Sequence, residues 1–154
     1  MTRPLDGVER VLVDLLDEVL APRGFRRRGR TWTRGGHPVL AMVTLQRESS
    51  FAALLVTIAF TPATDPAPTT LRQYQVRIRA ERVHGVSVQA LRALDLGAAG
   101  GVVDRDLLRS GLVDPIARLV AGVTDLSSLA VALGTEVSRN VFVHADLRDA
   151  LSRE

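Results

Sequence analysis

The chain has 154 residues, of which 46% are hydrophobic and 24% charged, with no cysteine and a formal net charge of +3. This composition suits one globular domain over residues 1–154, and it excludes disulfide bonds, thiolate metal sites and cysteine nucleophiles. The longest apolar run covers about half of the twenty residues that a membrane-spanning helix needs. Because acidic residues follow the N-terminus closely, no secretory signal is expected, and we predict a soluble cytoplasmic protein without membrane contact.

Arginine supplies all 20 basic residues, and there is no lysine. This bias is typical of GC-rich coding, although arginine is also the residue of choice for gripping carboxylates and phosphates. The small net charge does not by itself require a nucleic-acid partner.

The N-terminal third is predicted to form a helix followed by strands. Apolar residues at spacings of three and four predict an amphipathic helix over 4–21, which Pro22 and Gly24 should end. Strand-favouring residues follow at 31–33, and the apolar runs 39–46 and 51–61 predict a hairpin across the polar residues 47–50. Both sides of the second run are apolar, so this strand should be central, or covered on one side and exposed at an interface on the other.

A proline-rich loop at 62–70 precedes a half-buried strand, which the alternation from Tyr74 to Glu81 predicts. Residues 86–96 fit either a strand or a helix. The last third should be helical: Asp104 or Asp106 caps one helix, Asp114-Pro115 kinks it or starts a second, and Asp125 caps a short helix ending at Gly134. The fold class predicted is α+β: an antiparallel sheet of about four to five strands, with an N-terminal helix and C-terminal helices packed on it.

The strongest local signal is a basic segment with six arginines in residues 23–34. In a strand, Arg30 and Arg34 would share a face with Trp32, and an aromatic ring between arginines can stack on bases while the guanidinium groups hold phosphates. The favoured interpretation is a solvated strand edge whose charge prevents aggregation, with Trp32 in the core. An acidic protein partner and a nucleic acid are the alternatives, and Arg26 and Arg28 would contribute to either.

A second basic group could lie on the outward face of the later strand, where Arg77 and Arg79 project. If that strand lay beside strand 38–47, Gln46 or Arg47 would join them in an anion-binding face. Surface ion pairs of little energetic value are the simpler interpretation.

Catalytic signals are weak. His37, His84 and His144 are isolated, so no metal site is predicted, and no cofactor motif is recognisable. Ser49 and Ser50 lack the surroundings of a nucleophile elbow. An enzyme is therefore less favoured than a binding protein.

The segments Gly24–Arg34 and Val43–Phe51 together resemble a bacterial family catalogued as domain of unknown function 4304. Its members open with a helix, continue with a stretch similar to GFKRKGRTFYR, and then carry NLQKS before a phenylalanine-led strand. Trp32 and Gln46 stand where that pattern has an aromatic residue and a glutamine. The resemblance covers about residues 5–125. It implies a compact α+β fold and no particular activity, cofactor or catalytic residue.

Three functions follow as hypotheses. The favoured one is a protein-interaction module or homodimer, because apolar strands and an arginine-rich edge occur without catalytic groups. Nucleic-acid binding through segment 23–34 is the second. The third is a small-ligand-binding protein or enzyme, with a pocket between the sheet and the C-terminal helices.

Overall fold

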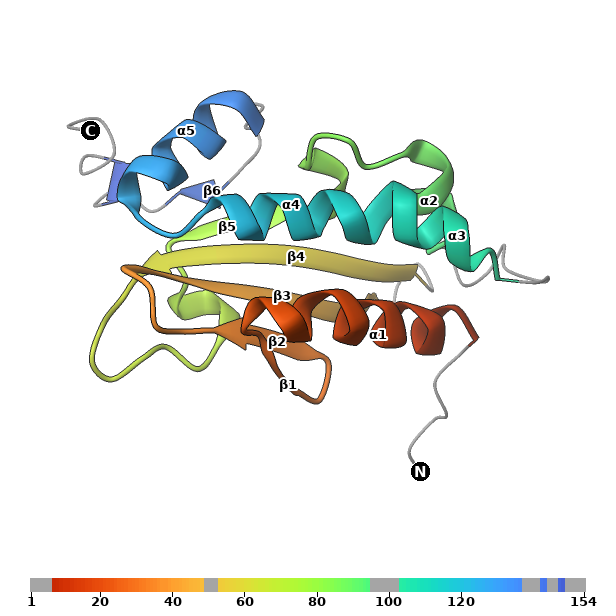
Figure 1. The fold of residues 1–154 in the computed structure, drawn as a ribbon, viewed down its shortest axis with the longest axis horizontal. Helices are drawn as coiled ribbons and strands as arrows, with labels where there is room; N and C mark the ends of the chain where they lie inside the picture. Colours follow the sequence, from red (N-terminus) through yellow and green to blue (C-terminus); the bar gives the residue numbers. More distant parts are fainter. Residues whose placement is uncertain (1–6, 49–52, 95–102, 137–141, 144–146, 149–154) are drawn as a thin grey trace.

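The computed structural model of the chain describes residues 7–48, 53–94, 103–136, 142–143 and 147–148. Its centre is an antiparallel six-stranded sheet in which each strand pairs with the next one along the chain (Figure 1). The strands are β1 (Arg26–Arg28), β2 (Thr31–Arg34), β3 (Val39–Glu48), β4 (Ala53–Pro62), β5 (Val76–Arg79) and β6 (Phe142–Val143). The predicted α+β class is confirmed. The sheet is wider than predicted because the short segments β1 and β6 extend its two edges.

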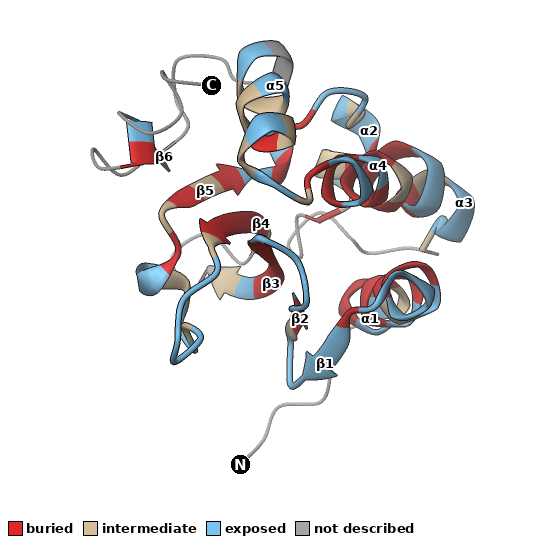
Figure 2. Ribbon diagram, turned by 60° about the vertical axis from the view of Figure 1, so that its left-hand side comes forward, coloured by how far each residue is buried: buried red, intermediate tan, exposed pale blue. Residues whose placement is uncertain are grey.

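Helices cover one face of this sheet. They are α1 (Gly7–Leu20), α2 (Val88–Arg92), α3 (Arg105–Leu108), α4 (Asp114–Gly122) and α5 (Leu126–Glu136), and 3-10 turns occupy Ala21–Arg23, Leu71–Gln73 and Ala80–Arg82. Figure 2 shows α1 to α4 on the same side of β1–β5. The helix predicted near the C-terminus continues past Gly134 to Glu136, since an exposed glycine in a helix costs stability without breaking it.

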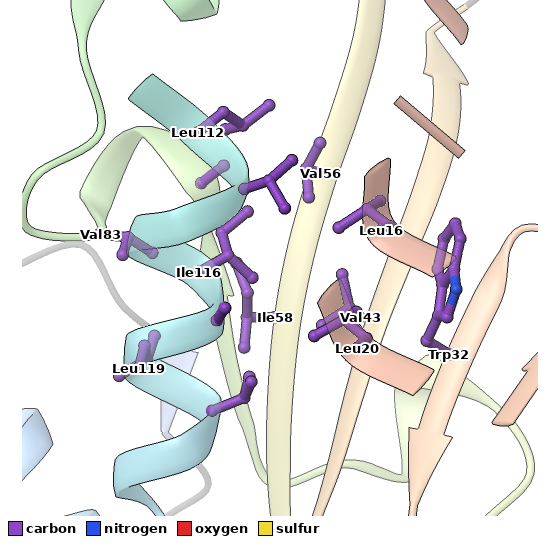
Figure 3. Packing of buried hydrophobic residues seen from close by; sticks show 14 of the residues in the cluster. Leu16, Leu20, Trp32, Val43, Val56, Ile58, Val83, Leu112, Ile116 and Leu119 are labelled. Atoms are coloured by element: carbon purple, nitrogen blue, oxygen red, sulfur yellow. The ribbon is translucent and has the colours of Figure 1, made fainter. Parts of the chain in front are cut away.

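The core lies between the sheet and the helices. Alternate residues of β3 and β4 point into it, and they meet the apolar stripes of α1 and α4. In Figure 3, Leu16 and Leu20 lie near Val43 and Trp32, whereas Ile116 lies near Ile58. At the end of α1, Gly24 adopts the left-handed conformation (φ 87°) and donates its backbone N–H to the carbonyl of Ala21. The spacing of the apolar residues correctly predicted which side of α1 is buried.

A π-helical turn (Arg109–Val113) joins α3 to α4, so Asp114-Pro115 starts α4 without a break in the helical path. Pro115 has no N–H for the carbonyl four residues earlier, that of Gly111. The backbone N–H of Ser87 donates to this carbonyl instead, at 2.8 Å. The Ser87 hydroxyl also accepts a hydrogen bond from Ala90 N–H and thereby caps α2. The undecided segment 86–96 therefore includes a short helix, α2, which docks on the π-helical turn.

The opposite face of the sheet carries a smaller apolar cluster. Leu40, Met42 and Ala59 from β3 and β4 pack there against Tyr74 and the half-buried Leu71, which belong to the connection between β4 and β5. β4 is a central strand, as predicted: helices cover its inner side, and this connection covers part of its outer side. On that outer side Ala53 and Leu55 stay half-buried.

Candidate functional site

The sheet face opposite the helices, called the open face below, carries arginines at both sides. Strand pairing aligns its side chains in two rows that run across five strands. The first row consists of Arg28, Thr31, Thr44, Thr57 and Arg79. The second row consists of Arg26, Thr33, Met42, Ala59 and Arg77. Each row therefore begins with an arginine of β1 and includes an arginine of β5, and the second row continues to Phe142 of β6.

In the middle of both rows, the side chains are either apolar or hydrogen-bonded to a neighbouring side chain of the same row. Thr44 is 7% exposed, and its hydroxyl lies 3.1 Å from that of Thr31, within hydrogen-bond distance. Met42 and Ala59 belong to the cluster under Tyr74. The groups available to a ligand are thus concentrated on β1 and β5.

The β1 edge of the open face borders a hollow of about 470 Å³. It is lined by Arg28, Thr31, Thr33, Met42, Pro68 and Thr69. The connection between β4 and β5 forms its far wall. The guanidinium group of Arg28 and the hydroxyls of Thr31 and Thr33 form a donor set that suits carboxylate or phosphate oxygens, whereas the Thr69 hydroxyl donates to Gln73 Oε1.

Gln73 holds the far wall of this hollow in place. Its side-chain oxygen accepts hydrogen bonds from the backbone N–H groups of Thr69 (2.7 Å) and Thr70 (3.0 Å). Burial of Tyr74 next to it anchors the segment on the sheet, and the same burial raises the pKa of the Tyr74 hydroxyl. Gln73 and Tyr74 were not predicted as site residues, because their position depends on contacts between the loop and the sheet.

Three of the four arginines of the open face form no ion pair with other described residues. Within the described part of the chain, the side chains of Arg26, Arg28 and Arg79 form no ion pair, and all three residues are exposed. Arg77 is half-buried. By contrast, α1 carries four acidic residues and one arginine. Three of these four carboxylates, those of Glu9, Asp17 and Glu18, already contact arginines.

Trp32 and Arg34 lie on the other side of β2 and do not belong to this site. Trp32 is 1% exposed, and its indole N–H donates to Asp17 Oδ1 at 2.9 Å. Its ring is therefore inaccessible to a base, as the core interpretation predicted. Arg34 is 5% exposed and donates to the carbonyls of Val120 (2.7 Å) and Val123 (2.6 Å) at the end of α4. Burial lowers the pKa of Arg34, but an arginine stays protonated at neutral pH.

Arg30 and Arg47 also face the helices. Both contact the buried carboxylate of Glu9: Arg30 Nε lies 3.2 Å from Oε1, and Arg47 Nη2 lies 3.4 Å from Oε2. The prediction that Arg47 could join Arg77 and Arg79 is therefore wrong. It assumed that the later strand lies beside β3, whereas β5 pairs with β4. Gln46 does lie on the open face, at the register position opposite Leu55.

A second hollow, of about 430 Å³, lies between α4 and α5. Its lining is mainly apolar, with His84 and Arg118 as polar members. The Ser128 hydroxyl in its wall is hydrogen-bonded to Asp125, whose carboxylate caps α5 and has a lowered pKa because of these bonds to Ser128. This hollow lies between helices. A further hollow of about 450 Å³ does lie between the sheet and a helix, lined by residues 53–56 of β4, Ala80, Glu81, Leu91 and Leu94.

Among the described residues, no three or more His, Asp or Glu side chains come close enough together to hold a metal ion. None of the helices within the described ranges is long and apolar enough to cross a membrane. No protein-family model, curated protein or solved structure matches the chain. The resemblance to the domain of unknown function 4304 family therefore stays a prediction.

Proposed function

We propose that this protein is a binding module whose open face takes up an acidic segment of a partner protein. The observation that carries the proposal is that three exposed arginines, Arg26, Arg28 and Arg79, lie on the sheet face opposite the α-helices and form no ion pair with a described residue. Guanidinium groups bind carboxylates through parallel N–H donors, and such charge-assisted hydrogen bonds are about twice as strong as neutral ones. The hydroxyls of Thr31 and Thr33 add donors beside Arg28.

An acidic protein segment fits this face better than a nucleic acid does. Proteins hold single-stranded bases mainly by stacking them on aromatic rings. Every aromatic side chain that the structure describes is buried, with exposures of 4% for Phe25, 1% for Trp32, 0% for Phe60 and 3% for Tyr74. A nucleic acid would then be held by charge alone. The arginines of β1 also prevent edge-to-edge pairing of sheets, a role that is compatible with binding.

The test measures fluorescence anisotropy of a labelled peptide of alternating glutamate and serine, titrated with the full-length protein at low and at physiological salt. The variant Arg28→Gln/Arg79→Gln removes one arginine from β1 and one from β5. We expect its affinity to fall about tenfold, which corresponds to about 1.4 kcal/mol. Added salt should weaken binding of the unmodified protein, because exposed charges are screened.

The matched control is Arg10→Gln/Arg92→Gln. It changes the net charge equally, but its two exposed arginines lie on α1 and α2. This control should bind the peptide like the unmodified protein. The proposal fails if both double variants bind equally well. It also fails if an oligothymidine of the same length binds and the acidic peptide does not, a result that would favour nucleic-acid binding.

A further inference from the structure

We infer that the hollow between α4 and α5 binds a small carboxylic acid with an apolar body, and that the carboxylate of this ligand pairs with Arg118. This hollow, called the α4–α5 hollow below, shares no lining residue with the hollow on the open face. The inferred site is therefore independent of the proposed function and can be tested separately from it.

The α4–α5 hollow has the size and the lining of a small-molecule site. Its volume of about 430 Å³ lies within the range of about 300–1,000 Å³ that is usual for ligand pockets. Most of its wall is apolar and consists of Pro115, Leu119, Val123, Val131 and Ala132, together with Gly122. Val131 is 65% exposed, so part of this apolar wall is in contact with water. A ligand with an apolar body would cover that surface, and the burial would favour binding.

Arg118 places its guanidinium group at the wall of the hollow, close to the backbone of Gly85. A Cβ added to Gly85 would lie 3.2 Å from Arg118 Nη2 and 3.6 Å from the ring of Pro115. Gly85 has a φ of 90°, a conformation that favours glycine. The turn at Gly85 thus leaves room for a charged group beside the apolar wall, and the neighbouring His84 lines the same hollow.

The Arg118 side chain is exposed and has no counter-charge among the described residues. It forms no ion pair there, although Asp114 lies one turn earlier on the same helix. The carboxylate of Asp125, at the start of α5, instead accepts hydrogen bonds from the backbone N–H and the hydroxyl of Ser128. The charge of Arg118 is therefore available to a ligand in the hollow.

One guanidinium group beside an apolar wall matches a ligand with one negative charge. A carboxylate carries that charge and accepts two parallel N–H bonds from a guanidinium group. A phosphate monoester carries a charge of about −1.5 to −2 at neutral pH, so Arg118 alone would leave part of it uncompensated. The inferred ligand is thus a monocarboxylic acid whose chain or ring lies against the wall formed by α4 and α5.

Titrations of the full-length protein with octanoate, 1-octanol and acetate, followed by amide NMR shifts, test the chemistry of the ligand. Octanol has the chain without the charge, and acetate has the charge without the chain. We expect octanoate to bind about fivefold more tightly than octanol, the gain that one exposed ion pair can supply. Hexanoate, two methylenes shorter, should bind about fifteenfold more weakly than octanoate, and acetate should not bind in the same concentration range.

Two glycines provide a matched pair of variants that test the location. An added Cβ meets nothing within 4 Å at Gly122 or at Gly134, and both residues belong to helices. Gly122 lines the hollow, whereas Gly134 is not among its lining residues. Gly122→Phe should fill the hollow and lower the affinity for octanoate by about tenfold or more, because the apolar body loses its place. Gly134→Phe should bind octanoate like the unmodified protein.

A second pair of variants tests the role of Arg118. Arg118→Gln should abolish the preference for octanoate over octanol and leave the affinity for octanol unchanged. Arg92→Gln changes the net charge equally, but its exposed side chain lies on α2 and does not line the hollow, so the preference should persist. Because octanol reports on the hollow itself, loss of the preference alone cannot be attributed to unfolding.

The inference fails if Gly122→Phe and Gly134→Phe bind octanoate equally well, or if the unmodified protein binds octanol as tightly as octanoate. Light scattering covers the remaining occupant, a second copy of this chain. A dimer that Gly122→Phe converts to a monomer, without octanoate binding to the unmodified protein, would make the hollow a self-association surface and overturn the inference. Each of these results would leave the proposed function of the open face standing.

Discussion

Glu9 in the first turn of α1 lies 3.4 Å from Arg47 near the end of β3, 38 residues later in the chain. The carboxylate has no solvent exposure, and Arg30, which precedes β2, contacts it from a second direction. One acidic side chain thus ties the start of the helix to two neighbouring parts of the sheet. Arg30 and Arg47 make this contact on the helix side of the sheet, so neither belongs to the open face.

Replacing Glu9 with glutamine should destabilise the protein by about 1.5–3 kcal/mol, the usual range for a hydrogen bond to a charged group. The amide keeps the shape of the side chain but leaves two arginines without their buried counter-charge. Chemical denaturation gives the free energy of unfolding. The matched control is Glu18→Gln, since Glu18 also contacts two arginines, Arg105 and Arg109, but is 47% exposed. Its loss should be below about 1 kcal/mol, and equal losses at the two positions would contradict the argument.

Periodicity in the sequence predicted the elements well where one pattern dominates. The stripe of α1 and the long hairpin of β3 and β4 were correctly located, because their apolar residues follow one period over many positions. The order of the strands was predicted less well. The sequence left open whether β5 lies beside β3; it pairs with β4, its neighbour along the chain, as consecutive strands do in most sheets.

Replacing Gly111 with alanine should destabilise the protein by about 1–3 kcal/mol, the cost of overpacking a filled core. An added Cβ would lie 2.5 Å from Ser87 Oγ and 2.9 Å from Ala90 Cβ, so α2 would have to move away from the π-helical turn. Thermal and chemical unfolding measure the effect. Gly134→Ala is the control, because nothing lies within 4 Å of its added Cβ in α5. That variant should be more stable by up to about 1 kcal/mol, because alanine favours a helix over glycine.

Replacing Arg34 with glutamine should cost about 2–4 kcal/mol, because two charge-assisted hydrogen bonds to the end of α4 are lost inside the protein. Arg34 also lies over the ring of Phe25, 5.4 Å from its centroid, and contributes packing there. Denaturant unfolding measures the loss. The exposed Arg79→Gln should unfold with the same midpoint as the unmodified protein. If Arg34→Gln did so as well, the two carbonyl contacts would be shown to contribute nothing.

The candidate site could be predicted from the sequence only in part. Arg26, Arg28, Arg77 and Arg79 were singled out, and they do lie on the open face. The sequence alone does not say which side of β2 meets the helices, and a shift by one residue exchanges the two sides. The sequence did contain one indication of which side of β2 is buried: the polar Thr31 and Thr33 flank the apolar Trp32. The alignment of arginines across five strands depends on the register of four pairings, which no local pattern contains.

Raising the pH above 10 should weaken the anchor that shapes the hollow on the open face. Burial raises the pKa of Tyr74 above its ordinary value of about 10. The unfolded chain then loses its phenol proton at a lower pH than the folded protein does. The contribution of Tyr74 to stability is therefore complete below pH 10 and is lost as the pH rises through the folded-state pKa.

The chain suits this measurement because it contains one tyrosine and neither lysine nor cysteine. Between about pH 9 and 11, Tyr74 is the side chain whose ordinary pKa lies in the range. Absorbance of the tyrosinate should show a midpoint above 10 in the folded protein and near 10 in denaturant. In parallel, the free energy of unfolding should decrease from pH 9 to pH 11. Tyr74→Phe keeps the ring packed against Met42 and Leu71 but cannot ionise, so this variant should lose the decrease. A decrease of the same size in Tyr74→Phe would show that another group is responsible.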